Sequence, residues 1–182
     1  MPQIVEEVYY VGTKERIARL GLNPLVNEIR SALTGFQLLV KEQVHANSRA
    51  SVRMLLGEQF DRLDGWTKTA SRGIDWTGCK TVNGTRVCIG VQARTSARSS
   101  LLVMDMIHLY SAFRDGRIDV GLVIVPSDKL SRFLTDRGPC MSDAKKHANA
   151  ARLEDSSLVL FGIEHDGTGP PLAKQSKKAS GK

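Results

Sequence analysis

The sequence predicts an α/β protein in which helices flank a central mixed β-sheet. Three observations support this fold class. Residues 73–92 are typical of a β-hairpin, because β-branched residues stand on both sides of Asn83-Gly84, a pair that favours tight two-residue turns. Two runs rich in Val, Ile and Leu, at 117–126 and 157–163, are typical of buried strands. Between and before these segments, apolar residues recur at the spacing of a helix.

The remaining elements are predicted in chain order. Residues 4–11 are β-branched and aromatic enough for a short strand, and Asn23-Pro24 marks a helix start, since proline is favoured in the first helical turn. Further helices are expected at 51–63, 101–114, 126–134 and 142–153. We expect a single domain over residues 1–165, followed by a disordered basic tail at 166–182, which is rich in Gly, Pro, Ser and Lys.

The chain is basic, with a net charge of +7. The tail contains four lysines and one aspartate, so it carries +3 and leaves +4 for the rest, which permits a polyanionic partner without requiring one. No apolar run is long enough to span a bilayer and the first residues lack a signal-peptide pattern, so we expect a cytoplasmic protein without membrane contact. Cys79, Cys88 and Cys140 are accordingly expected to be free thiols.

The register of the hairpin places polar side chains on one of its faces. With Asn83-Gly84 as the turn, the facing pairs are Asp75 with Gln92, Thr77 with Gly90, and Cys79 with Cys88. These six residues share one face because successive residues of a strand point to opposite faces. The other face receives Ile74, Trp76, Val87, Ile89 and Val91. We therefore expect one packed apolar face and one open polar face.

An aspartate near the end of one strand, opposed by polar residues on the next, is the skeleton of a metal-dependent phosphodiesterase site. A divalent ion held by carboxylates on neighbouring strands polarises the phosphate and lowers the pKa of the attacking water. The alternative is that Asp75 is a strand-edge residue and Gln92 an ordinary cross-strand partner. The hairpin alone does not separate these two interpretations.

The runs RVCIGVQ (86–92) and GRIDVGLVIVPSDKL (116–130) resemble two strands of the BglII/BstYI family of type II restriction endonucleases, which belongs to the PD-(D/E)xK superfamily. Weaker likenesses in EQFDRLDGW (58–66), the opening IVEEVYYVG and the closing SLVLFGI extend the resemblance over most of residues 4–163. It implies a restriction-endonuclease-like core. It also implies a homodimer that cuts a short palindrome in double-stranded DNA with Mg²⁺, and a cognate DNA methyltransferase in the same cell.

The resemblance assigns the catalytic positions to Asp75, Gly90 and Gln92, with Asp75 as a ligand of Mg²⁺. Gln92 matches the glutamine that the family carries in place of the usual lysine. Gly90 departs from the pattern, because the family has its metal-binding glutamate there. Three explanations remain open: an inactivating substitution, a natural DNA-binding protein that has lost catalysis, or another carboxylate that takes over, with Glu58 the best candidate. A glutamate introduced at position 90 is expected to complete the ion site.

Contacts to DNA are expected from three segments. Residues 94–100 combine arginines and hydroxyls at a predicted helix start, which suits phosphate or base contacts. The resemblance assigns base reading to the loop 136–143, and residues 68–72 precede Asp75 closely enough to touch the DNA backbone. The candidate residues are Arg94, Ser96, Arg98, Ser99, Arg137, Ser142, Asp143, Lys68 and Arg72. A basic RNA-associated protein is a less favoured alternative, because few aromatic residues are available for stacking on bases.

Overall fold

The computed structural model describes residues 1–182 except 11, 94–98, 136–137, 151–156 and 174–182. The strands are β1 (Gln3–Tyr9), β2 (Leu39–Val40), β3 (Thr67–Thr69), β4 (Trp76–Val82), β5 (Thr85–Ala93), β6 (Val120–Pro126), β7 (Leu158–Glu164) and β8 (Gly167–Thr168). The helices are α1 (Thr13–Arg19), α2 (Asn23–Thr34), α3 (Arg49–Asp61), α4 (Ser99–Arg114), α5 (Asp128–Phe133) and α6 (Met141–Ala150). The predicted α/β class and the main predicted elements are confirmed.

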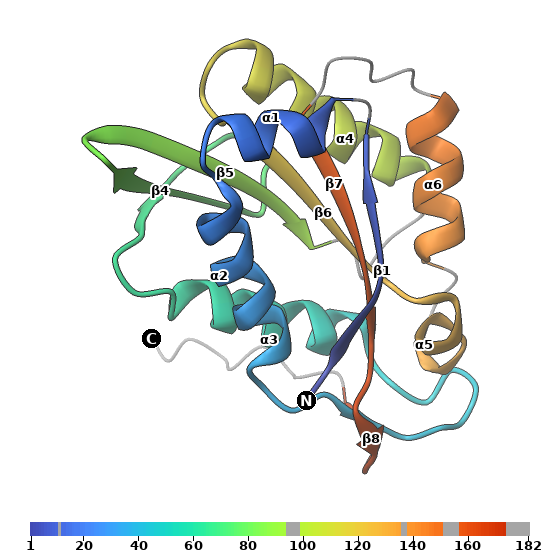
Figure 1. Ribbon diagram of the computed structural model, residues 1–182. Helices are drawn as coiled ribbons and strands as arrows, with labels where there is room; N and C mark the ends of the chain where they lie inside the picture. The colour runs from blue at the N-terminus through green and yellow to red at the C-terminus, as the bar shows by residue number, and fades with distance from the viewer. Residues whose placement is uncertain (11, 94–98, 136–137, 151–156, 174–182) are drawn as a thin grey trace, which may run out of the picture.

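Within the described part of the chain, six strands form a mixed sheet in the order β1-β7-β6-β5-β4-β3. The three strands β5, β6 and β7 run parallel, whereas β1, β4 and β3 are antiparallel to their neighbours. Parallel neighbours need crossover connections, and here α4 lies between β5 and β6, and α5 and α6 between β6 and β7. Figure 1 shows the β4–β5 ribbon extending to the left, beyond the helices that flank the sheet.

Each face of the sheet has its own apolar core. One core joins α2 and α3 to alternate residues of the strands, such as Val91 and Phe161. The other joins α4 and α6 to the residues in between, such as Val123 and Leu160. Strand β6 is apolar throughout, and β7 is apolar up to its last residue, Glu164, because helices cover both strands on both sides. Of the helices described, none has the length and apolar character that crossing a membrane requires.

The β4–β5 hairpin has the predicted register. Its paired residues include Val82 with Thr85, Cys79 with Cys88, and Thr77 with Gly90. Asn83 and Gly84 have φ values of 50° and 78°, which a two-residue turn of this kind requires. On the α3 side, the ring of Trp76 crosses Gly78 so closely that a Cβ at Gly78 would lie 2.1 Å from it. Glycine is therefore needed there for Trp76 to pack.

Ile74 was expected on the same face as Trp76, and this prediction is wrong. Ile74 packs against the α4–α6 core instead. The reason is that β4 begins only at Trp76, after a left-handed turn at Gly73 (φ 79°), so the alternation of the strand does not extend back to Ile74.

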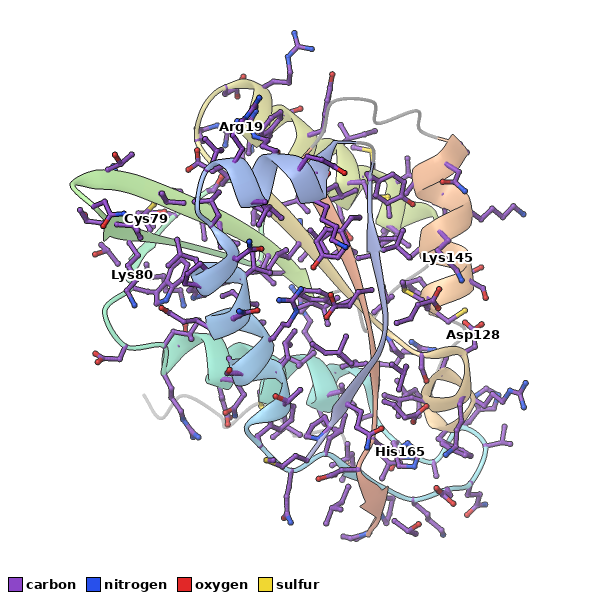
Figure 2. The ribbon with its side chains drawn as sticks, viewed as in Figure 1. Arg19, Cys79, Lys80, Asp128, Lys145 and His165 are labelled. Carbon is purple, nitrogen blue, oxygen red and sulfur yellow. A yellow bond between two sulfur atoms is a disulfide. The ribbon has the colours of Figure 1, made fainter. Side chains whose placement is uncertain are left out.

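Cys79 and Cys88 form a disulfide, and the prediction of free thiols is wrong for this pair. Their Cα atoms are 4.0 Å apart because the register sets the two residues directly opposite each other on antiparallel strands. Figure 2 labels Cys79 on the ribbon formed by β4 and β5. Cys140 is a free thiol, as predicted.

The start predicted for the disordered tail, residue 166, lies too early in the chain. Residues 166–173 belong to the fold: β8 pairs in parallel with β2, and Leu172 packs against the α2–α3 core. The backbone of Leu172 also donates to the side chain of Asn47 and accepts from the N–H of Ser48. Composition alone missed this because one apolar residue and a few backbone hydrogen bonds hold the segment. Residues 174–182 lie outside the described residues.

Candidate functional site

The candidate site lies where the chain enters β4. Asp75 immediately precedes this strand, and its carboxylate accepts a hydrogen bond of 3.1 Å from the backbone N–H of Ala93 at the end of β5. The same carboxylate forms an ion pair with Arg53 of α3. The Asp75 side chain remains 20% exposed. Two elements thus hold the carboxylate in place while leaving part of it accessible to a ligand.

Gln92 fixes the turn that presents Asp75. Its side-chain oxygen accepts a hydrogen bond of 3.2 Å from the backbone N–H of Asp75, and its amide nitrogen donates to the carbonyl of Gly73. The ring of His108 occupies the space that a Cβ at Gly73 would need, at 2.6 Å, so the turn requires glycine. Asp75 and Gln92 therefore lie together, as predicted, but Gln92 is 1% exposed and its amide is engaged with the backbone.

Gly90 lies beneath α4. A Cβ added there would stand 3.0 Å from a methyl group of Leu109 and 3.0 Å from a methyl group of Ile118. Thr77, the cross-strand partner of Gly90, is buried as well. The prediction of an open polar face is wrong at this position, because α4 packs across β5 to bury its own apolar side chains. A glutamate at position 90 would start in apolar contact rather than in an open ion site.

A cleft of about 150 Å³ collects four charged side chains beside the start of β4. They are Asp75, Arg53 and Asp61 of α3, and Lys68 of β3. The ammonium of Lys68 lies 2.5 Å from the carboxylate of Asp61. Two carboxylates and two cations in one cleft can bind both a metal ion and the oxygens of a phosphate.

Asp61 and Arg53 are missing from the sequence-based prediction of the site. The signal that identifies them is helical spacing: Arg53, Gly57, Phe60 and Asp61 recur at i, i+4, i+7 and i+8, and all four line the cleft. Glu58, the predicted substitute carboxylate, does not line it. Each residue of a helix is rotated by about 100° from the last, so Glu58 faces another direction than its neighbour Gly57. Its side chain is 47% exposed and lies 3.9 Å from Arg62.

Asp75 and Asp61 offer two carboxylates to Mg²⁺ in one cleft, whereas of the positions that the family resemblance implies only Asp75 offers one. Mg²⁺ prefers oxygen ligands, keeps several waters, and is commonly held by one or two carboxylates together with substrate phosphate oxygens. Gly90 supplies no ligand, and the side-chain oxygen of Gln92 already accepts from Asp75. No group of three or more His, Cys, Asp or Glu side chains in the described ranges is arranged to hold a metal ion.

The structure places only some of the predicted DNA-binding residues. Arg94, Ser96, Arg98 and Arg137 lie outside the described residues, and Ser99 is the first residue of α4. Lys68 lines the cleft of Asp75. Arg72 borders an adjoining groove of about 410 Å³ and is exposed; it forms no hydrogen bond or ion pair with other described side chains. Arg72 is thus available to bind a phosphate.

Ser142 and Asp143 have structural partners at the start of α6. Ser142 donates from its hydroxyl and its backbone N–H to Asp128, and Asp143 accepts a 3.3 Å hydrogen bond from the N–H of Cys140. Hydrogen bonds from Cys140 and Ser142 hold the pKa of Asp128 below its ordinary value. Burial, together with the hydrogen bond to Asp128, raises the pKa of the Cys140 thiol to about 11. A role of Ser142 and Asp143 in base reading remains a prediction.

Two observations bear on the function: the cleft around Asp75 and the resemblance of the hairpin sequence. Comparisons with models of known protein families and with curated proteins find no match for this chain.

Proposed function

We propose that this protein is a sequence-specific type II restriction endonuclease that hydrolyses phosphodiester bonds at a short palindrome in duplex DNA. One observation carries the proposal: Asp75 and Asp61 line a single cleft together with Arg53 and Lys68. This donor set suits a metal-dependent phosphodiesterase. Asp61 would replace the carboxylate that the family resemblance leads one to expect at Gly90.

Each residue of the cleft has a distinct role in this proposal. Asp75 and Asp61 would hold Mg²⁺, which would polarise the scissile phosphate and lower the pKa of the attacking water. Arg53 and Lys68 bind phosphate oxygens and offset the negative charge that develops on them. Their side chains are 44% and 61% exposed, so each can exchange its carboxylate partner for a phosphate when DNA binds. Gln92 keeps Asp75 at the mouth of the cleft.

The proposal includes a homodimer. The two strands of a palindrome are equivalent and are cut by two equivalent sites related by a twofold axis. The surface of α4 supports this, because Leu101, Met104 and Ile107 lie on one side of the helix and are 40–46% exposed. In a cell that carries the active enzyme, a cognate DNA methyltransferase would protect the host sites.

A second candidate function is sequence-specific DNA binding without cleavage. The packing at Gly90 favours it, since Leu109 and Ile118 close the position where the family has its glutamate. The pairing of Asp75 with Arg53 favours it as well, because the carboxylate already has a cationic partner. The two candidates share the DNA partner and differ only in whether Asp61 completes an ion site.

Cleavage of a duplex library that contains all short palindromes, with and without Mg²⁺, tests the proposal. The unaltered protein is expected to cut one sequence slowly. Asp75→Asn and Asp61→Asn should each slow cutting about a hundredfold or more, because a carboxylate ligand contributes several kcal/mol to a dication site. Glu58→Gln is the matched control: it removes a carboxylate from the same helix, but outside the cleft.

The outcomes separate the alternatives. Loss of cutting in Glu58→Gln but not in Asp61→Asn would identify Glu58 as the second carboxylate and contradict our choice of Asp61. Specific binding without any cutting, in Mg²⁺ or Mn²⁺, would support the noncatalytic protein. Absence of both binding and cutting on every duplex would overturn the DNA-directed function.

A further inference from the structure

A second cleft, of about 420 Å³, opens on the α4 side of the β4–β5 ribbon, and both half-cystines of the Cys79–Cys88 disulfide line it. Its walls are residues 69–71 on one side and the turn at 116–119 on the other. Cys88 is half-buried, whereas Cys79 is only 4% exposed. A molecule in this cleft therefore reaches the sulfur of Cys88 more easily. Asp75 and Asp61 do not line this cleft.

The two half-cystines have different surroundings. The guanidinium of Arg86 donates a hydrogen bond of 3.4 Å to the sulfur of Cys79. Arg86 has no carboxylate partner among the described side chains, so its charge is available to stabilise a negative sulfur. Two hydrogen bonds join the backbone of Cys88 to Asp119. The N–H of Cys88 donates to the carboxylate of Asp119 at 2.8 Å, and the carbonyl of Cys88 accepts from the N–H of Asp119 at 2.7 Å. The arrangement makes Cys79 the better leaving group and Cys88 a fixed target.

The cleft also offers groups that recognise a ligand. Arg86, Arg117 and Asp119 line it. Because Arg117 is paired with Asp115, Arg86 supplies the charge that attracts an anion. The hydroxyl of Thr77, which lines the cleft together with Cys79, is buried and has no hydrogen-bond partner among the residues that the structure describes. A buried polar group without a partner is destabilising unless water or a ligand satisfies it.

We propose that Cys79–Cys88 is a redox-active disulfide that exchanges with a low-molecular-weight thiol carrying carboxylate groups. The thiolate of the small molecule attacks the sulfur of Cys88, the Cys79–Cys88 bond breaks, and its electron pair leaves on Cys79 as a thiolate beside Arg86. A second thiolate attacks the small-molecule sulfur of the mixed disulfide and releases Cys88 as a thiolate. Two small thiols are oxidised to one disulfide, and the two protons they lose protonate Cys79 and Cys88.

The test is a time course of the oxidised, folded protein with three thiols: mercaptoacetate (anionic), 2-mercaptoethanol (neutral) and cysteamine (cationic). Rates are compared at equal thiolate concentration, and acid-quenched samples are mapped by mass spectrometry. We expect the anionic thiol to react about tenfold faster than the cationic one, because the charge of Arg86 attracts it. The first mixed disulfide should form on Cys88.

Arg86→Gln should slow the reaction about tenfold and reduce the preference for the anionic thiol, and Arg86→Lys should restore much of both. Arg132→Gln is the matched control, because it removes the same charge from an exposed site on α5, away from the disulfide. A disulfide that resists all three thiols until the protein is unfolded in urea would overturn the proposal. So would first attack at Cys79, or equal rates in Arg86→Gln. None of these measurements depends on DNA binding or cleavage.

Discussion

The side chain of Gln92 links the backbone N–H of Asp75 to the carbonyl of Gly73, so one buried residue of β5 determines how the chain enters β4. Replacing Gln92 by Leu would leave both backbone groups without their partner. We expect a loss of about 1–3 kcal/mol in the free energy of unfolding, the usual cost of a buried unsatisfied polar group. Urea denaturation measures it. Gln43→Leu, at an exposed position, should change stability little, and equal stabilities of the two variants would contradict the role given to Gln92.

Gly90→Glu tests the packing beneath α4. The hairpin register alone predicts that this change completes an ion site. The contacts with Leu109 and Ile118 predict instead a loss of about 1–3 kcal/mol in stability, as for an overpacked core, and no gain in Mg²⁺-dependent cleavage. Gly90→Glu combined with Leu109→Ala should cut faster than Gly90→Glu alone, because the second change makes room for the carboxylate. Rapid cutting by Gly90→Glu alone would show that Leu109 and Ile118 shift at little energetic cost.

The sequence predicted those parts of the fold whose signals are local. Asn83-Gly84 specifies the turn, and the position of the turn determines which residues of β4 and β5 face each other. The long apolar runs of β6 and β7 identify strands covered on both sides. The two-residue strands β2 and β8 were missed, because their pairing joins segments more than a hundred residues apart and leaves no periodicity to read.

In the candidate site, too, local sequence signals predicted some residues and missed those that only the packing of the fold places. Asp75 and Gln92 were found because each directly adjoins the last pair of the ladder, Trp76 with Val91; the side chain of Gln92 then bonds the backbone of Asp75. Asp61 was missed because its position depends on how α3 is rotated against the sheet, which only the packed structure decides. The closure of Gly90 has the same origin, since α4 follows β5 in the chain but crosses it in space. The disulfide was implicit in the register, and the expected cellular compartment argued against it.

Arg72 is expected to bind a DNA phosphate. Each phosphate contact made by a cation steepens the salt dependence of binding by about one unit in the slope of log K against log salt. Arg72→Gln should therefore reduce that slope by about one and weaken binding to all duplexes alike, because phosphate contacts carry no base information. Fluorescence anisotropy over a salt series provides the slope. Arg132→Gln should leave it unchanged, and a change in sequence preference in Arg72→Gln would point to base contact instead.

The apolar residues on α4 predict where the homodimer forms. Met104 is 46% exposed between Leu101 and Ile107. Met104→Glu places a charge in the centre of this surface and should shift the protein toward monomers, because an unpaired charge is costly to bury in an interface. Light scattering at micromolar concentration measures the shift, and Val44→Glu, at another exposed apolar residue, serves as control. A monomeric unaltered protein, with and without its DNA, would contradict the dimer.

Cys140 should be an unreactive thiol. Burial is the main cause that raises its pKa to about 11, and the hydrogen bond to Asp128 adds to it. Because only the thiolate is alkylated, the rate with iodoacetamide at pH 8 should be about a hundredfold below that of a thiol with a pKa near 9, less any gain in intrinsic nucleophilicity.

The pH profile supplies the decisive measurement. The alkylation rate should keep rising up to about pH 11. Mass spectrometry measures this rate on the oxidised protein, in which Cys140 is the free cysteine. Because the pKa is higher in the folded state, the stability it contributes is complete below about pH 9 and is lost as the pH rises toward 11. The thiol has two carboxylates as acceptors, Asp128 and, at 3.4 Å, Asp143. Asp128→Asn removes the one with the larger effect on the pKa and should move the midpoint of the profile to lower pH. Asp115→Asn, at an exposed carboxylate paired with Arg117, should not move it. A midpoint near 9 in the unaltered protein would mean that the thiol is neither buried nor held by Asp128.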